Sequence, residues 1–130
     1  MFKGKHALVT GAAGGIGTSI VEKLRAQGAK VVVADRVTEG IAAEAHLPGD
    51  LLDGLYCDGL AAAASVALGG LDIVINNAGV ITRGPVTETS DADWELSMGV
   101  NVEAPFRICR AAIPLMAETG GGTIVNTASC

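Results

Sequence analysis

The glycine-rich segment from Thr10 to Gly17 constrains the fold of this chain more than any other feature. It follows the apolar run Ala7-Leu8-Val9 and leads into a stretch whose apolar residues recur at helical spacing. Glycines let the backbone approach a ligand closely, and the N–H groups of a first helical turn lack partners within the helix. The segment therefore predicts a strand, a tight turn and a helix whose N-terminus binds a phosphate group.

An acidic residue stands where a second strand should end. Asp35 follows the apolar run 31–34, and an acid at that place can accept hydrogen bonds from a ribose diol. Its carboxylate would repel a 2′-phosphate, which favours NAD over NADP, although Arg36 could partner a phosphate. The alternative interpretation is that the glycines only allow close packing and that Asp35 is a solvated residue closing a strand.

Strand and helix patterns alternate along all 130 residues. We expect strands at 6–10, 30–35, 52–57, 71–76 and 123–127, and helices at 16–27, 38–46, 60–68 and 91–118. The strands are apolar throughout, which is typical of a parallel sheet covered by helices on both faces. The sequence predicts an α/β, doubly wound, Rossmann-like fold in one domain, residues 1–130. Because its fifth strand would leave an open apolar edge, we expect a domain incomplete at its C-terminus.

Charge and composition exclude several classes of function. The net charge is −5 without a basic cluster, which argues against nucleic-acid and anionic-membrane partners. No apolar run is long enough for a membrane span, and no signal peptide is visible. The three cysteines, Cys57, Cys109 and Cys130, lack metal-ligand spacing, so we expect free thiols, no metal site and a cytoplasmic location.

Asn101 interrupts an apolar stripe in the expected helix 91–118. The stripe consists of Trp94, Met98, Pro105, Ile108, Ala112 and Leu115. A buried amide needs partners, and Pro105 has no N–H to donate to the Asn101 carbonyl. The pattern predicts a kink with a free carbonyl at Asn101, either for a function or only to wrap the helix around the core.

Together these motifs resemble the compact branch of the short-chain dehydrogenase/reductase family, over the N-terminal part of such an enzyme. Residues 10–17 resemble its T-G-x-x-x-G-x-G loop, and Asn76-Asn77-Ala78-Gly79 matches its N-N-A-G signature. Asn101 matches its helix asparagine, and residues 124–129 resemble the strand that leads to its active-site serine.

The resemblance implies a role for each matching residue. The pyrophosphate would contact Gly11, Gly15, Ile16 and Gly17. Asp35 would hold the adenosine ribose with Arg36 beside it, and Asp58 would meet the adenine amino group, with Cys57 flanking the ring. Along the ribose would lie Asn77, Ala78 and Gly79. The catalytic residues would be Asn101, which holds a relay water, and Ser129, which stabilises the substrate oxygen.

The resemblance also implies an NAD-dependent oxidoreductase that moves a hydride between nicotinamide and a secondary alcohol or ketone, as a homo-oligomer (dimer or tetramer). The family's general base is a tyrosine in a Tyr-x-x-x-Lys motif after the serine. The sole tyrosine here is Tyr56, which precedes the serine and has no lysine four residues on. We therefore expect the 130-residue chain by itself to be inactive. The alternative is a non-catalytic dinucleotide-binding module or a scaffold.

Overall fold

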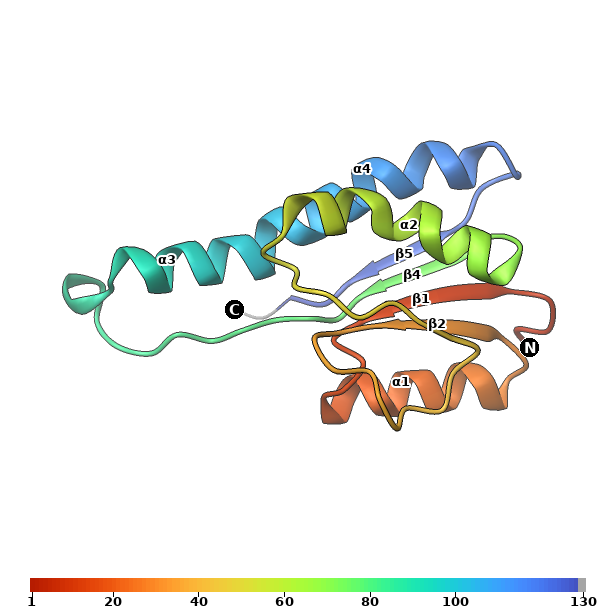
Figure 1. Ribbon diagram of the computed structural model, residues 1–130, viewed down its shortest axis with the longest axis horizontal. Coiled ribbons are helices and arrows are strands. Elements are labelled where there is room, and N and C mark those ends of the chain that lie inside the picture. The colour runs from red at the N-terminus through yellow and green to blue at the C-terminus, as the bar shows by residue number, and fades with distance from the viewer. Residues whose placement is uncertain (129–130) are drawn as a thin grey trace.

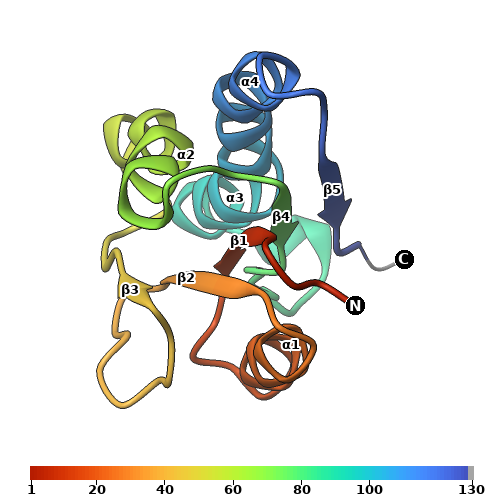
Figure 2. The same ribbon diagram turned by 90° about the vertical axis from the view of Figure 1, so that its right-hand side faces the viewer.

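The computed structural model describes residues 1–128, which form a five-stranded parallel sheet in the order β3-β2-β1-β4-β5 (Figure 2). The strands are β1 (His6–Thr10), β2 (Lys30–Ala34), β3 (Ala45–His46), β4 (Ile73–Asn76) and β5 (Thr123–Asn126). All four pairings are parallel, and β1 pairs with both β2 and β4. The order reverses direction at β1, so the predicted doubly wound α/β architecture is confirmed.

Helices cover both faces of this sheet (Figure 1). On one face lie α2 (Gly54–Leu68) and α4 (Ala104–Ala117), and on the other lies α1 (Gly15–Ala26). Successive β1 residues enter different cores, because Leu8 packs toward α2 and α4 while Ala7 and Val9 pack toward α1. Burial on both faces explains why the strands are apolar without alternation.

Two expected elements are wrong. The helix expected at 38–46 does not form; residues 38–44 are a loop that leads into β3, with Ile41 and Ala43 packed against the core on the α1 side. The strand expected at 52–57 does not form: residues 54–57 are instead the start of α2, and the Leu55 and Tyr56 N–H groups of its first turn donate to the Asp53 carboxylate. The apolar run there has helical spacing, since its buried residues are Cys57, Leu60, Ala61, Ala64 and Leu68.

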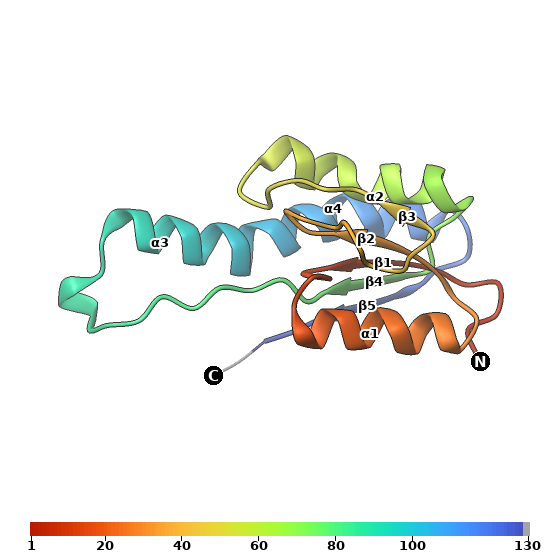
Figure 3. The same cartoon turned by 60° about the horizontal axis from the view of Figure 1, so that its bottom comes forward.

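The long helix expected at 91–118 forms, but it widens into a π turn where the sequence placed Asn101 and Pro105. A short 3₁₀ turn, Val86–Glu88, precedes α3 (Asp91–Met98), and a π turn at Gly99–Glu103 joins α3 to α4. In that turn the Ala104 N–H donates to the Gly99 carbonyl five residues earlier. The α3 part of the long helix projects beyond the carboxyl edge of the sheet (Figure 3). Trp94 and Met98, two residues of the expected apolar stripe, are therefore exposed. Within residues 1–128, the helices are too short or too polar to cross a membrane.

Candidate functional site

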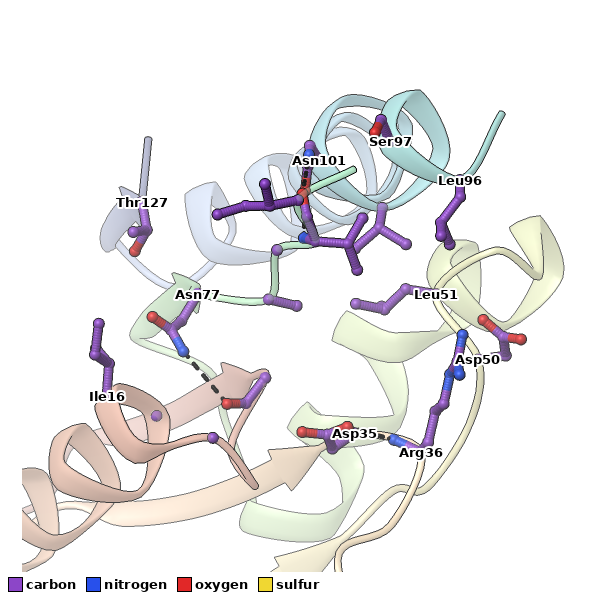
Figure 4. A pocket seen from close by; sticks show the side chains of 18 of the residues that line it. Ile16, Asp35, Arg36, Asp50, Leu51, Asn77, Leu96, Ser97, Asn101 and Thr127 are labelled. Atoms are coloured by element: carbon purple, nitrogen blue, oxygen red, sulfur yellow. Dashed lines mark hydrogen bonds between the residues drawn. The ribbon is translucent and has the colours of Figure 1, made fainter. Parts of the chain in front are cut away.

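A cleft of about 1140 Å³ lies at the carboxyl edge of the sheet, beneath α3 and the π turn (Figure 4). In open α/β sheets this edge, near the point where strand order reverses, is the usual place for a ligand. The residues that line it are Gly11, Gly14, Gly15, Ile16, Gly17, Asp35, Arg36, Gly49, Asp50, Leu51, Asn77, Ala78, Gly79, Val80, Ile81, Thr82, Leu96, Ser97, Val100, Asn101, Thr127 and Ala128.

The loop after β1 is packed tightly against the segment after β4. Gly11 has φ +63°, and a Cβ there would lie 2.7 Å from the Ala78 Cα atom. The Thr10 hydroxyl oxygen accepts hydrogen bonds from the Asn77 N–H (3.1 Å) and the Ala78 N–H (3.2 Å). The Asn77 side-chain amide in turn donates a hydrogen bond to the Gly11 carbonyl at 3.3 Å. These contacts explain Gly11 and part of the N-N-A-G motif by packing alone.

Gly17 is also required by packing, because a Cβ there would overlap the Gly11 carbonyl group. Gly15 is different. A Cβ on Gly15 would meet nothing within 4 Å of it among the described residues, and its φ is not positive. The fold alone therefore does not explain the glycine at position 15.

The first turn of α1 can hold an anion. Its N-cap, Gly14, has no side-chain hydrogen bond, and the turn contains no acidic residue. The Ile16 side chain is 69% exposed beside it, so the turn is open to the cleft. Unpaired N–H groups at the positive end of a helix dipole, with room for a close approach at Gly15, fit a phosphate or pyrophosphate group.

Asp35 links the end of β2 to the glycine loop. Its Oδ2 accepts a hydrogen bond from the Ala13 N–H at 2.9 Å, and its Oδ1 accepts one from the Arg36 N–H at 2.7 Å. A carboxylate has about four lone-pair positions, so capacity remains for hydroxyl donors in the cleft. Asp35 and Arg36 both line the cleft, as the sequence led us to expect.

Cys57 and Asp58 do not reach the cleft, because they lie in α2 and not at a strand end. Cys57 is fully buried, and burial raises the pKa of its thiol to about 11. Asp58 forms ion pairs with Arg107 (3.0 Å) and Arg110 (3.2 Å) of α4. Partial desolvation acts to raise the pKa of Asp58, but the hydrogen bonds from both arginines outweigh it and hold that pKa below its usual value.

Asp50 and Leu51 line the cleft in place of those two residues. The Asp50 Oδ1 atom accepts a hydrogen bond from the Leu52 N–H at 2.9 Å, which closes a tight turn just before α2. The signal in the sequence was Asp53, a favoured N-cap residue, which marks the start of a helix and leaves the preceding residues in the loop between β3 and α2.

Asn101 is exposed, not buried, and it acts as a clamp. Its side-chain amide donates to the Val80 carbonyl (2.8 Å), and its Oδ1 accepts from the Val80 N–H (2.9 Å). These two bonds hold the chain leaving the N-N-A-G motif against the π turn. A second link joins the same loop to α3, because the Thr82 and Ser97 hydroxyl oxygens lie 3.0 Å apart.

The end of the cleft nearest β5 is only partly described. Thr127 and Ala128 line it, whereas Ser129 lies outside the described residues. Asn76 of β4 is buried and donates to the Asn126 Oδ1 atom at 2.8 Å, which ties the ends of these two strands together. Within the described part of the chain, Cys57 and Cys109 are free thiols, and no group of acids, histidines and cysteines could hold a metal.

Comparison with known proteins gives the family. The model of the short chain dehydrogenase family matches residues 5–130. The chain belongs to the short-chain dehydrogenase family. D-threitol dehydrogenase of Mycolicibacterium smegmatis is 41% identical to this chain over an alignment of 138 positions. The alignment covers 97% of this chain and 53% of that protein. The chain thus spans about half the length of the curated relatives it matches.

Solved structures agree with this assignment. A candidate short-chain alcohol dehydrogenase from Sinorhizobium meliloti superposes with a TM-score of 0.91 and 38% identity, covering 98% of this chain and 55% of that one. A metagenomic short-chain oxidoreductase in complex with NADP superposes with a TM-score of 0.90 and 33% identity, covering 99% of this chain and 63% of that one.

Proposed function

We propose that this short-chain dehydrogenase chain is the NAD-binding part of an oxidoreductase that transfers a hydride between nicotinamide and a secondary alcohol or ketone. The observation that carries the proposal is Gly15, a glycine that the fold does not need, at an uncapped helix N-terminus that opens into the cleft. A close approach of pyrophosphate to the backbone is the reason for this glycine.

The positions along the cleft suggest how a dinucleotide would lie. The pyrophosphate would meet the N–H groups from Gly15 to Gly17, at the middle of the sheet. The adenosine half would extend toward β2 and β3, with its ribose at Asp35 and its base between Asp50 and Leu51. The nicotinamide half would extend past Asn77, Ala78 and Gly79 toward β5. Asp50 and Leu51 here take the place that the sequence assigned to Asp58 and Cys57.

NAD is the proposed cofactor because of Asp35. A carboxylate facing the adenosine ribose can accept from both ribose hydroxyls but repels a 2′-phosphate. Some structural relatives bind NADP, and Arg36 lies next to Asp35 on the cleft. In support, Asp35 lies at the carboxyl end of β2 and accepts a hydrogen bond from the Ala13 N–H of the glycine loop, so its charge lies beside the proposed pyrophosphate site.

The chemistry needs both the cofactor and a proton-transferring group. When bound, nicotinamide supplies hydride exchange, and the protein supplies position and electrostatics. Asn101 would hold a relay water, and Ser129 would hold the substrate oxygen. Tyr56 is unsuited as a base: burial raises its pKa to about 12, and its hydroxyl donates to the Leu47 carbonyl. We therefore propose that residues 1–130 alone bind cofactor without turning over substrate.

An apolar strip along the π turn and α4 supports the proposed homo-oligomer. Val102, Phe106 and Ile113 are 52%, 57% and 56% exposed and recur at helical spacing, which is unusual for a solvent-facing side of a helix. A second copy is the proposed occupant. The free thiols Cys57 and Cys109 fit the proposed cytoplasmic location.

The proposal is tested by titrating the chain with NADH and measuring binding through the change in nicotinamide fluorescence. Gly15→Ala should weaken binding about 10-fold, as a lost phosphate contact would, without lowering the melting temperature. The matched control is Gly59→Ala in α2, where an added Cβ also meets nothing within 4 Å of it. Failure of the unsubstituted chain to bind NADH, or equal binding by Gly15→Ala, would refute the proposal.

A further inference from the structure

Residues 47–51 connect β3 to the turn before α2, and Gly49, Asp50 and Leu51 of this segment line the cleft. The segment has no regular secondary structure, so its shape depends on contacts with the rest of the chain. It carries the two side chains that the proposed function assigns to the adenine base. What holds the segment in place therefore bears directly on ligand binding.

Tyr56, in the first turn of α2, makes two contacts with this segment. Its hydroxyl donates a hydrogen bond to the Leu47 carbonyl. Its ring lies directly against Gly49, where an added Cβ would come within 2.6 Å of the ring atom Cζ. Gly49 does not have a positive φ, so the ring is the reason why a glycine is needed there. One side chain thus fixes both the start and the middle of the segment.

Neighbouring contacts complete the support. The Gly49 N–H donates to the Asp35 carbonyl at 3.0 Å, which ties the segment to the end of β2. The Cys57 thiol donates to the Leu51 carbonyl at 3.2 Å. The segment is therefore held between Asp35 on one side and the first turn of α2 on the other.

We propose that Tyr56 is a positioning residue for cofactor binding, which holds residues 47–51 in the shape that receives the adenine base of the dinucleotide. This inference rests on the proposed function and adds a determinant outside the cleft, since Tyr56 does not line it. The hydroxyl sets the position of the backbone at Leu47, and the ring sets the closest approach at Gly49.

Burial agrees with this assignment. Tyr56 is partly buried against the core shared by α2 and α4, and its hydroxyl donates to the Leu47 carbonyl from that position. A tyrosine that only filled the core would need neither its hydroxyl bond nor a glycine opposite its ring. Phenylalanine would pack as well in that case.

The test measures two probes on the same chain by NMR titration: ADP-ribose, which contains the adenine base, and inorganic pyrophosphate, which does not. Tyr56→Phe should weaken ADP-ribose binding about 2- to 10-fold, the effect of one lost hydrogen bond, and leave pyrophosphate binding unchanged. Amide exchange should also become faster at Gly49 and Asp50. The matched control is Thr119→Val, which removes a hydroxyl that donates to the Met116 carbonyl far from the cleft.

A second variant, Tyr56→Leu, removes the hydroxyl and most of the ring and should weaken ADP-ribose binding further. If Tyr56→Leu fails to fold, Tyr56→Phe alone decides the question. Equal ADP-ribose binding by the unsubstituted chain and Tyr56→Phe overturns the inference, as does a parallel loss of pyrophosphate binding. If the unsubstituted chain binds neither probe, the proposed function fails first, and the two failures are thus distinguished.

Discussion

Substitution of Asp35 offers the sharpest test of cofactor choice. Asp35→Ala removes an acceptor for the ribose hydroxyls and the partner of the Ala13 N–H. Hydrogen bonds to a charged acceptor contribute about 1.5–3 kcal/mol, so a loss of about 2 kcal/mol should weaken NADH binding about 30-fold. The same change removes repulsion of a 2′-phosphate, which is about 1 kcal/mol per charge pair at about 4 Å in water and about 4 kcal/mol near a protein surface.

Because Asp35 is half-buried at an open cleft, we take a value of about 2 kcal/mol for the relieved repulsion. NADPH binding should then improve about 30-fold, and the ratio of the two dissociation constants should shift about 1000-fold toward NADPH. Asp35→Asn separates the two roles. Its amide oxygen can still accept from the Ala13 N–H, so NADH binding should fall less than in Asp35→Ala while the gain for NADPH remains.

The assay is fluorescence titration of NADH and NADPH with the same protein preparation. Glu39→Ala is the matched control, because Glu39 is an exposed acid of the next loop that does not line the cleft. It changes the net charge equally, so it should leave the ratio of dissociation constants near that of the unsubstituted chain. An unchanged ratio in Asp35→Ala, or an equal shift in Glu39→Ala, would refute the local role of Asp35.

Three further predictions concern stability and the corrected residues. The folded pKa of the Cys57 thiol is about 11 against a usual value of 9.0, so its contribution to stability is complete below pH 9 and is lost as the pH rises toward 11. In urea unfolding across this range, the unsubstituted chain should lose on the order of 2 kcal/mol of unfolding free energy, and Cys57→Ala should not show this loss. Asn101→Ala breaks both bonds to Val80 and should speed amide exchange at Val80 about 10-fold or more, whereas unchanged exchange would contradict the clamp. Asp58→Asn should leave NADH affinity unchanged, because Asp58 forms an ion pair with Arg107 of α4 and does not line the cleft. A large loss of affinity would show that Asp58 contributes to cofactor binding after all.

The glycine loop was predictable because the strand and helix on either side of it are neighbours in the chain, whereas the N-N-A-G segment was assigned by its resemblance to the family. A strand, a glycine turn and a helix follow one another between residues 6 and 26, and apolar strands covered on both faces appear as unbroken apolar runs. Gly15, Asp35 and Asn77 accordingly line the cleft as expected. The irregular turn in the long helix was also predictable locally, since Pro105 lacks an N–H.

The errors arose where a short apolar run allows two interpretations. Residues 52–57 could form a buried strand or the first turn of a helix, and periodicity alone does not separate the two. Asp53, as the N-cap of α2, decides for the helix. That choice moves Cys57 and Asp58 into α2 and brings Asp50 to the cleft, so a single misassigned element displaced two site residues.

The sequence by itself determined the sheet class, the glycine turn between β1 and α1, the acid at the end of β2 and the place of the irregular turn in the long helix. Each follows from residues that are neighbours in the chain. Only the tertiary structure decided which residues meet across the fold: Thr10 with Asn77, Asn101 with Val80, and Asp58 with Arg107. These partners lie 67, 21 and 49 residues apart, and strand order and helix packing bring them together, which local spacing does not encode.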